Sequence, residues 1–333
     1  MGLFIKKPFA DLIAEANESG SKTLKRVLGP WGLIALGVGA IIGAGLFSIT
    51  GTVAAEYTGP AITLSFIIAA VGCCFAGLCY AEFASMIPVA GSAYTYSYAT
   101  MGELIAWIIG WDLVLEYTVA ATTVSISWSR YLVVFLQGIG IDLPPEWTAC
   151  PWDGGIANIP AAIIVIIMSL FLVRGTQESS LVNNIIVFLK VSVILIFVVL
   201  GWQFIQADNY TPYIPANTGT LGEFGFSGVL RGAAVVFFAF LGFDAVSTAA
   251  QETKNPERNM PIGILMSLLV CTVLDLLFAH VMTGVAHYTE FAGQQGIAPP
   301  GIDYTNVKES IKFYINEGNN CVGEGYIVKV TED

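Results

Sequence analysis

Six ionisable side chains lie inside otherwise apolar stretches of this sequence. A charged group near the centre of a lipid-embedded helix costs about 2.5–3.5 kcal/mol on insertion scales unless it is paired or hydrated. Such residues therefore mark pathways for protons, ions or polar solutes, and six are too many for a passive anchor. They are Asp112, Glu116, Lys190, Asp244, Asp275 and His280.

Lys190 is the most informative of these residues, because it stands near the middle of an apolar run. Burial disfavours the ammonium, whereas a nearby acid such as Glu116 or Asp244 would favour it. A lysine balanced in this way could gain and lose a proton during a functional cycle. The alternative is a permanent salt bridge that fixes two helices in register. Asp112 and Glu116 are four residues apart and share a helix face, which suits a water-filled cavity.

Glycines mark a second kind of site in the run GPWGLIALGVGAIIGAGLFSITG. Gly39 and Gly43 could form a packing face that lets a neighbouring helix approach closely. A helix broken near Gly43, Ala44 and Gly45 would instead expose backbone N–H groups and a positive helix end to an anion. The two interpretations are compatible.

A later apolar run offers a partner for this break. Its centre, FLGFDAV, aligns with IIGAGLF, which places Gly242 against Gly43 and Asp244 against Gly45. Two spans interrupted at corresponding depth, about five spans apart, are typical of a transporter built from inverted repeats, with its site at the repeat interface.

The elements that position these residues are membrane helices. The chain is 55% hydrophobic and 12% charged, about half the charged fraction of a soluble domain. Its runs are apolar all round, which favours helices over a barrel. The net charge of −11 gives little support to nucleic-acid binding. A helix needs about 20 apolar residues to cross a bilayer. The sequence offers about seven such runs, near 31–51, 60–80, 103–136, 159–174, 181–204, 227–251 and 262–287.

Basic residues between the runs predict the orientation. They fall on one side of the predicted topology, and the opposite loops carry acids without Lys or Arg, so the N-terminus is predicted to be cytoplasmic. We expect residues 1–29 to form a cytoplasmic segment, 30–288 a transmembrane domain and 289–333 a polar tail. The basic residues are Lys6, Lys7, Lys22, Lys25, Arg26, Arg174, Lys254 and Arg258.

Enzymatic chemistry finds no support in the sequence. It contains no Cys-His or Ser-His-Asp grouping with local support for nucleophilic catalysis. His280 and His287 are seven residues apart without a third ligand nearby, so a metal site is not expected. We predict neither an enzyme nor a bound cofactor.

Five motifs in order resemble the cationic amino acid transporter branch of the amino acid-polyamine-organocation superfamily. The resemblance runs from about Leu24 to Pro299. It implies an all-α, multi-span fold like that of the bacterial leucine transporter, with inverted five-helix repeats, broken first and sixth helices and alternating access. The motifs are GVGAIIGAGLF, PVAGSAYTYSYATMGE, GWDLVLEY, FFAFLGFDAVSTAAQETKNP and MPIGI.

The resemblance also implies a substrate site. Backbone N–H groups at the first break would hold the substrate carboxylate, and carbonyls at both breaks its amino group. An acid in the third span would face the substrate side chain, and a lysine in the fifth would occupy the place where relatives bind sodium. The matching residues are Gly43, Ala44 and Gly45 for the carboxylate and Ile41, Phe238, Ala239 and Leu241 for the amino group, with Phe238 also serving as an aromatic lid. Glu116 matches the acid of the third span, Lys190 the lysine of the fifth, and Asp244 an acid at the break of the sixth.

The expected function is secondary active transport of small or cationic L-amino acids by proton symport or exchange. The expected location is the cell membrane, such as a bacterial inner membrane, with the protein crossing it several times. The family has about twelve or more spans, so the second repeat lacks its last three helices here and the chain is interpreted as truncated after the seventh. Asp275 sits where the family is ordinarily uncharged. The alternative is a non-transporting fragment that partners a full-length relative. Expected partners are an amino acid, the proton, lipid and another copy of the chain.

Overall fold

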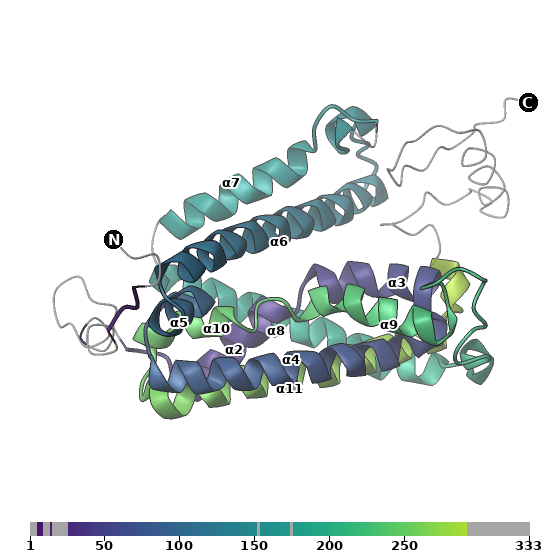
Figure 1. Ribbon diagram of the computed structural model, residues 1–333. Coiled ribbons are helices and arrows are strands. Elements are labelled where there is room, and N and C mark those ends of the chain that lie inside the picture. The colour runs from purple at the N-terminus through teal and green to yellow at the C-terminus, as the bar shows by residue number, and fades with distance from the viewer. Residues whose placement is uncertain (1–4, 9–13, 15–25, 152–153, 174–175, 292–333) are drawn as a thin grey trace, which may run out of the picture. The chain divides into compact units, whose positions relative to one another are not determined.

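The computed structural model describes residues 5–8, 14, 26–151, 154–173 and 176–291. Within these residues the regular elements are all helical (Figure 1). The chain divides into two compact units, 1–120 with 175–292 and 121–174 with 293–333.

The first unit holds the residues singled out above. Two of its helices are interrupted, and both interruptions carry short 3-10 or π-helical turns between α-helical pieces. Its elements are α2 (Pro30–Ile41), a π-helical turn (Gly45–Ile49), α3 (Thr50–Val53), α4 (Ile62–Met86), α5 (Ser92–Thr100), the first half of α6 (Glu103–Gly138), α8 (Thr176–Gly201), α9 (Gly225–Val236), a 3-10 turn (Phe237–Phe240), α10 (Ala245–Thr248) and α11 (Pro256–Val285).

Helix α11 is the centre of this unit, and it packs against α4, α2 and α8 (Figure 1). Small residues allow close approach, as in membrane helix pairs generally. A Cβ added at Gly37 of α2 would collide with Ser267, and one added at Gly77 of α4 would lie 2.6 Å from Leu268. The buried core therefore runs along α11.

In the part of the chain that the structure describes, five helices are long and apolar enough to cross a membrane. One of these five is the stretch Pro30–Met86, which contains the first two predicted runs and consists of several successive helical segments. The fourth predicted run forms α7 (Ile159–Val173), whose 15 residues fall short of a full crossing. The all-α, multi-span prediction is confirmed, whereas the fourth helix is shorter than a spanning helix requires.

Large apolar side chains are exposed on α8 of the first unit and on α7 of the second. Phe188 is 76% exposed and Val173 84% exposed. Side chains of this type on spanning helices are suited to contact lipid tails.

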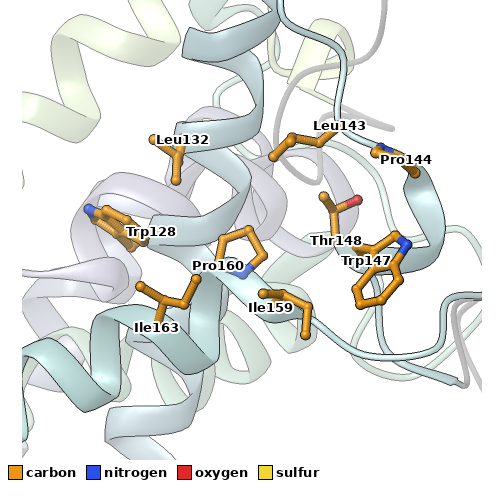
Figure 2. Close-up of a pocket in the computed structure, with 9 residues that line it drawn as sticks. All are labelled: Trp128, Leu132, Leu143, Pro144, Trp147, Thr148, Ile159, Pro160 and Ile163. Atoms are coloured by element: carbon orange, nitrogen blue, oxygen red, sulfur yellow. The ribbon is translucent and has the colours of Figure 1, made fainter.

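The second unit joins the last part of α6 to α7. Asn158 precedes α7, where its Oδ1 accepts the Ala161 N–H at 3.1 Å and the Ser129 hydroxyl at 2.7 Å. Nearby lies a cavity of about 460 Å³ with an almost entirely apolar lining (Figure 2). Trp128 and Trp147 are among its lining residues, and Thr148 is the one polar side chain in the lining.

The predicted end segments fall mostly outside the described residues. Of 1–29, only short pieces are described, and of 289–333, nothing beyond residue 291.

Candidate functional site

The first helix is broken where the glycines predicted. Helix α2 ends at Ile41, and Ile42 is extended with φ −71° and ψ 110°. The chain resumes through Gly43 and Ala44 into the π-helical turn that begins at Gly45, where Phe47 N–H donates to the Gly43 carbonyl at 3.2 Å. The first N–H groups of a new helical segment have no intrahelical acceptor. The break therefore presents donors suited to an anion.

The sixth helix is broken in the matching place. Helix α9 gives way to the 3-10 turn Phe237–Phe240, after which Leu241 is extended with φ −56° and ψ 136°. Gly242 follows at φ +106°, a conformation open chiefly to glycine. The Phe238 carbonyl accepts the Leu241 N–H at 3.3 Å. Both predicted breaks are thus confirmed.

The two breaks lie against each other. A Cβ added at Gly45 would collide with the Ala239 backbone, and one added at Gly242 would lie 3.0 Å from the Ala40 carbonyl. A Cβ at Gly43 would meet no atom within 4 Å. The contact explains why glycine stands at Gly45 and Gly242, while Gly43 borders open space.

Lys190 reaches the break from α8. Its Nζ donates to the Gly39 carbonyl at 2.9 Å and to the Ile42 carbonyl at 2.8 Å. These carbonyls belong to the C-terminal end of α2, where the helix dipole also favours a cation. The expected acidic partner is therefore wrong for this arrangement: Lys190 is held by backbone oxygens instead of by Glu116 or Asp244.

Asp244 forms a different cluster beside the sixth-helix break. Its side chain is 5% exposed, and its Oδ2 accepts the Tyr117 phenol at 2.8 Å and the Ser92 hydroxyl at 3.2 Å. Ser92 begins α5 and Tyr117 lies on α6, so the carboxylate joins three segments distant in sequence. The sequence interpretation missed both hydroxyls, although Tyr117 directly follows Glu116 in the GWDLVLEY motif.

Glu116 is half-buried on α6 and lies within electrostatic range of Asp244 and Asp112. The hydrogen bond from Tyr117 to Asp244 places the segment of α6 that carries Glu116 beside the sixth-helix break. Lys190 contacts the first break instead, so the predicted residues divide into an acidic side and a basic side.

Asp275 is 1% exposed on α11. Its Oδ2 has no hydrogen-bond partner among the described residues. Cys271, one turn earlier, lies within electrostatic range of both Asp275 and Lys190.

His280 lies further along α11 in an aromatic cluster. The Tyr210 ring stacks on the imidazole at 4.9 Å, and its hydroxyl donates to the His280 carbonyl at 2.8 Å. Burial raises the pKa of the Tyr210 phenol to about 12, so this hydroxyl remains a donor at neutral pH. The cluster fixes the loop before α9 onto α11.

The cavities found in the two units lie elsewhere. The apolar one of Figure 2 offers no group for a substrate carboxylate. A second, of about 240 Å³ in the first unit, is lined by α4 and α5 residues that include Tyr80 and Tyr96. Neither is lined by residues of the two breaks. Within the described part of the chain, no group of three or more His, Cys, Asp or Glu residues could hold a metal ion.

The comparisons with known proteins agree with this architecture. Residues 28–311 match the family model described as amino acid permease. The chain therefore belongs to the amino acid permease family, whose members are membrane transporters and not enzymes.

Three relatives show the breadth of this family. The chain is 50% identical over 297 residues to the branched-chain amino acid permease BcaP of Bacillus subtilis, which covers 87% of this chain and 61% of that protein. It is 44% identical to the methylthioribose transporter of Bacillus subtilis, in an alignment that covers 89% of this chain and 65% of that protein. It is 37% identical to the vacuolar cationic amino acid transporter 4 of Arabidopsis thaliana, in an alignment that covers 86% of this chain and 48% of that protein. The chain thus spans about half to two thirds of these relatives.

Proposed function

We propose that the protein is a secondary active transporter that moves small or cationic L-amino acids across the cell membrane by proton symport or exchange. The observation that carries the proposal is the pair of broken helices in direct contact, with open space at Gly43. Half-helix ends at such breaks suit the carboxylate and ammonium of an amino acid. Alternating access around this site would complete the cycle.

The proposed binding roles follow the geometry of the breaks. The N–H groups of Gly43, Ala44 and Gly45 bind the carboxylate. Carbonyls of Ile41, Phe238, Ala239 and Leu241 bind the ammonium, with Phe238 covering the site. The chemistry needs no metal or organic cofactor, because charged groups of the substrate meet backbone dipoles.

Two observations favour different side chains on the transported amino acid. Glu116 favours a cationic side chain by charge. The identity to a branched-chain amino acid permease favours an aliphatic one. Arginine, alanine and leucine therefore separate the possibilities, with methylthioribose as a fourth solute because another relative is named for it.

Lys190 is the proposed coupling residue. Among the described residues, backbone carbonyls hold the Lys190 ammonium, so it can release its proton without leaving a carboxylate unpaired. Deprotonation would remove the charge that binds α8 to the first break. We place the N-terminus in the cytoplasm, on the side of the basic loops.

Uptake into proteoliposomes tests the proposal. The 333-residue chain is reconstituted, and uptake of the four labelled solutes is compared with and without an inward proton gradient. Saturable, gradient-stimulated uptake of an amino acid is expected. Lys190→Met and Glu116→Gln should weaken it while the protein inserts normally. Parental uptake by both variants would overturn the site assignment.

A second candidate function is a non-transporting membrane protein that associates with a longer relative or with another copy. The observation that favours it is the coverage of only 61% of the Bacillus subtilis permease. It predicts no uptake by well-inserted chain alone. Supplying the remaining part of that permease in the same vesicles should then restore uptake.

A further inference from the structure

Asp275 is a buried acid that the proposed function leaves unused. It is 1% exposed in the middle of α11, and its Oδ2 has no hydrogen-bond partner in the described part of the chain. A buried ionised carboxylate without a partner is strongly destabilising in a low-dielectric interior. Burial therefore favours the protonated form of this group over the carboxylate.

The register of the helices brings Asp275 level with the first-helix break. Leu33 of α2 lies against Gly263 of α11, and Gly37 against Ser267, so the two helices run in parallel. The Gly37–Ser267 contact lies before the break and the Phe47–Phe278 contact lies after it, so Asp275 lies along α11 at the level of the first-helix break. The Phe47 and Phe278 rings, 5.9 Å apart, extend the same register one turn beyond it.

Helix α8 approaches the same face of α11. The Phe197 and Phe278 rings are 4.8 Å apart, and a Cβ on Gly201 would meet Val281. One or two turns earlier along this parallel pair, Lys190 lies within electrostatic range of Cys271. Asp275 thus lies about one turn beyond the lysine that binds the break.

Other titratable groups near this face are few. Helix α2 and α10 contribute none, and the buried titratable side chain of α4 is the Cys73 thiol. Further along α11, His280 is engaged by Tyr210. Cys271 is therefore the described titratable group that lies within electrostatic range of Asp275.

We propose that Asp275 is a second proton-binding site, which holds the coupling proton beside the first-helix break and releases it when that break opens to water. In the release step the O–H bond of the carboxylic acid breaks, and the proton passes to a water molecule. The inference rests on the proposed transport function for its role, but the proton site exists independently of transport.

Infrared spectroscopy of the purified chain in lipid tests the site without transport. The carbonyl band of a protonated carboxylic acid is expected at neutral pH in the parent and is lost in Asp275→Asn. Asp112→Asn, which changes an exposed acid of α6, is the matched control and should retain the band. Asp275→Glu, which keeps an acid at the position, should retain a shifted band. An unchanged band in folded Asp275→Asn would overturn the proposal, as would loss of the band on adding sodium ions.

Transport then tests the coupling role. In proteoliposomes, Asp275→Asn is expected to exchange labelled for unlabelled amino acid while losing stimulation by the proton gradient. Undiminished stimulation would overturn the coupling role. No uptake by the parent, with the infrared band present, would count against the proposed function and leave the proton site standing.

Discussion

At the scale of single residues, the two glycines of the first break have opposite surroundings. Gly45 faces the Ala239 backbone, whereas Gly43 faces open space. Adding a methyl group at each glycine would therefore separate the packing role of Gly45 from the proposed binding role of Gly43.

We expect Gly45→Ala to lower the free energy of unfolding by about 1–3 kcal/mol, because the new methyl collides with backbone that cannot rotate away. Gly43→Ala should unfold like the parent and weaken only amino acid binding. Thermal unfolding in detergent and equilibrium binding of the transported amino acid separate the two effects. Equal stability of both variants would contradict the close contact between the breaks.

The hydroxyls around Asp244 give a second expectation. Tyr117→Phe removes the 2.8 Å bond to Oδ2 and should destabilise the protein by about 1 kcal/mol, as lost hydrogen bonds commonly do. Tyr94→Phe is the control, since Tyr94 is 40% exposed and its removed hydroxyl has no bond to Asp244. Chemical denaturation in mixed micelles measures both. A larger loss for Tyr94→Phe would show that the Asp244 cluster is not the stabilising one.

The residue types in the sequence predicted part of the site, but they did not predict which groups contact the site residues. Gly43 and Gly242 could be recognised as breaks because glycine interrupts apolar runs at corresponding depth. The partners of Lys190 could not be predicted from the sequence, because every residue type has a backbone carbonyl and the sequence does not show which carbonyl accepts a bond. Ser92 and Tyr117 were missed for a related reason, because their meeting at Asp244 depends on how three distant segments pack.

At the scale of elements, α11 owes its central place to small residues on the helices around it. Gly77 of α4 is buried against Leu268, whereas Gly72, on the same helix, is exposed and meets no atom within 4 Å. The contrast distinguishes the packed face of α4 from its exposed face.

Gly77→Leu is expected to separate α4 from α11 and to lower the melting temperature by several degrees, a destabilisation of about 1–3 kcal/mol. Gly72→Leu should leave melting unchanged, because its side chain extends into lipid or detergent. Fluorescence-detected melting of the two variants checks this. Similar melting of both would mean that the α4–α11 contact does not limit stability.

Element bounds were predictable where hydrophobic length alone decides them. The run 103–136 agrees with α6 to within two residues, because a long apolar stretch has few alternatives in lipid. The run near 159–174 gave the position of α7 but overstated its ability to cross. The local π-helical and 3-10 turns were not foreseen, since contact between the breaks and not local propensity selects them.

At the scale of the whole molecule, the relatives extend well beyond the part that this chain matches. The chain covers 61% of the Bacillus subtilis branched-chain permease. The residues around both breaks nevertheless lie in one compact unit. Substrate binding and completion of the transport cycle can therefore be separated experimentally.

We expect the reconstituted chain to bind an amino acid even if it does not carry one across the membrane, because both breaks are present. Isothermal titration in lipid nanodiscs measures this binding, with Gly43→Ala as the weakened variant. Absence of binding to well-folded chain would show that the site requires segments found only in the longer relatives.

The bonds from Lys190 to Gly39 and Ile42 also have a mechanical consequence. Because one ammonium holds the last carbonyls of α2, that helix cannot swing about its break without dragging α8 or first breaking both bonds. In the proposed alternating-access cycle, Lys190 would therefore restrain movement at the first-helix break until both bonds are broken. A small cation or a water molecule that competes for the two carbonyls would weaken this restraint without contacting the amino acid.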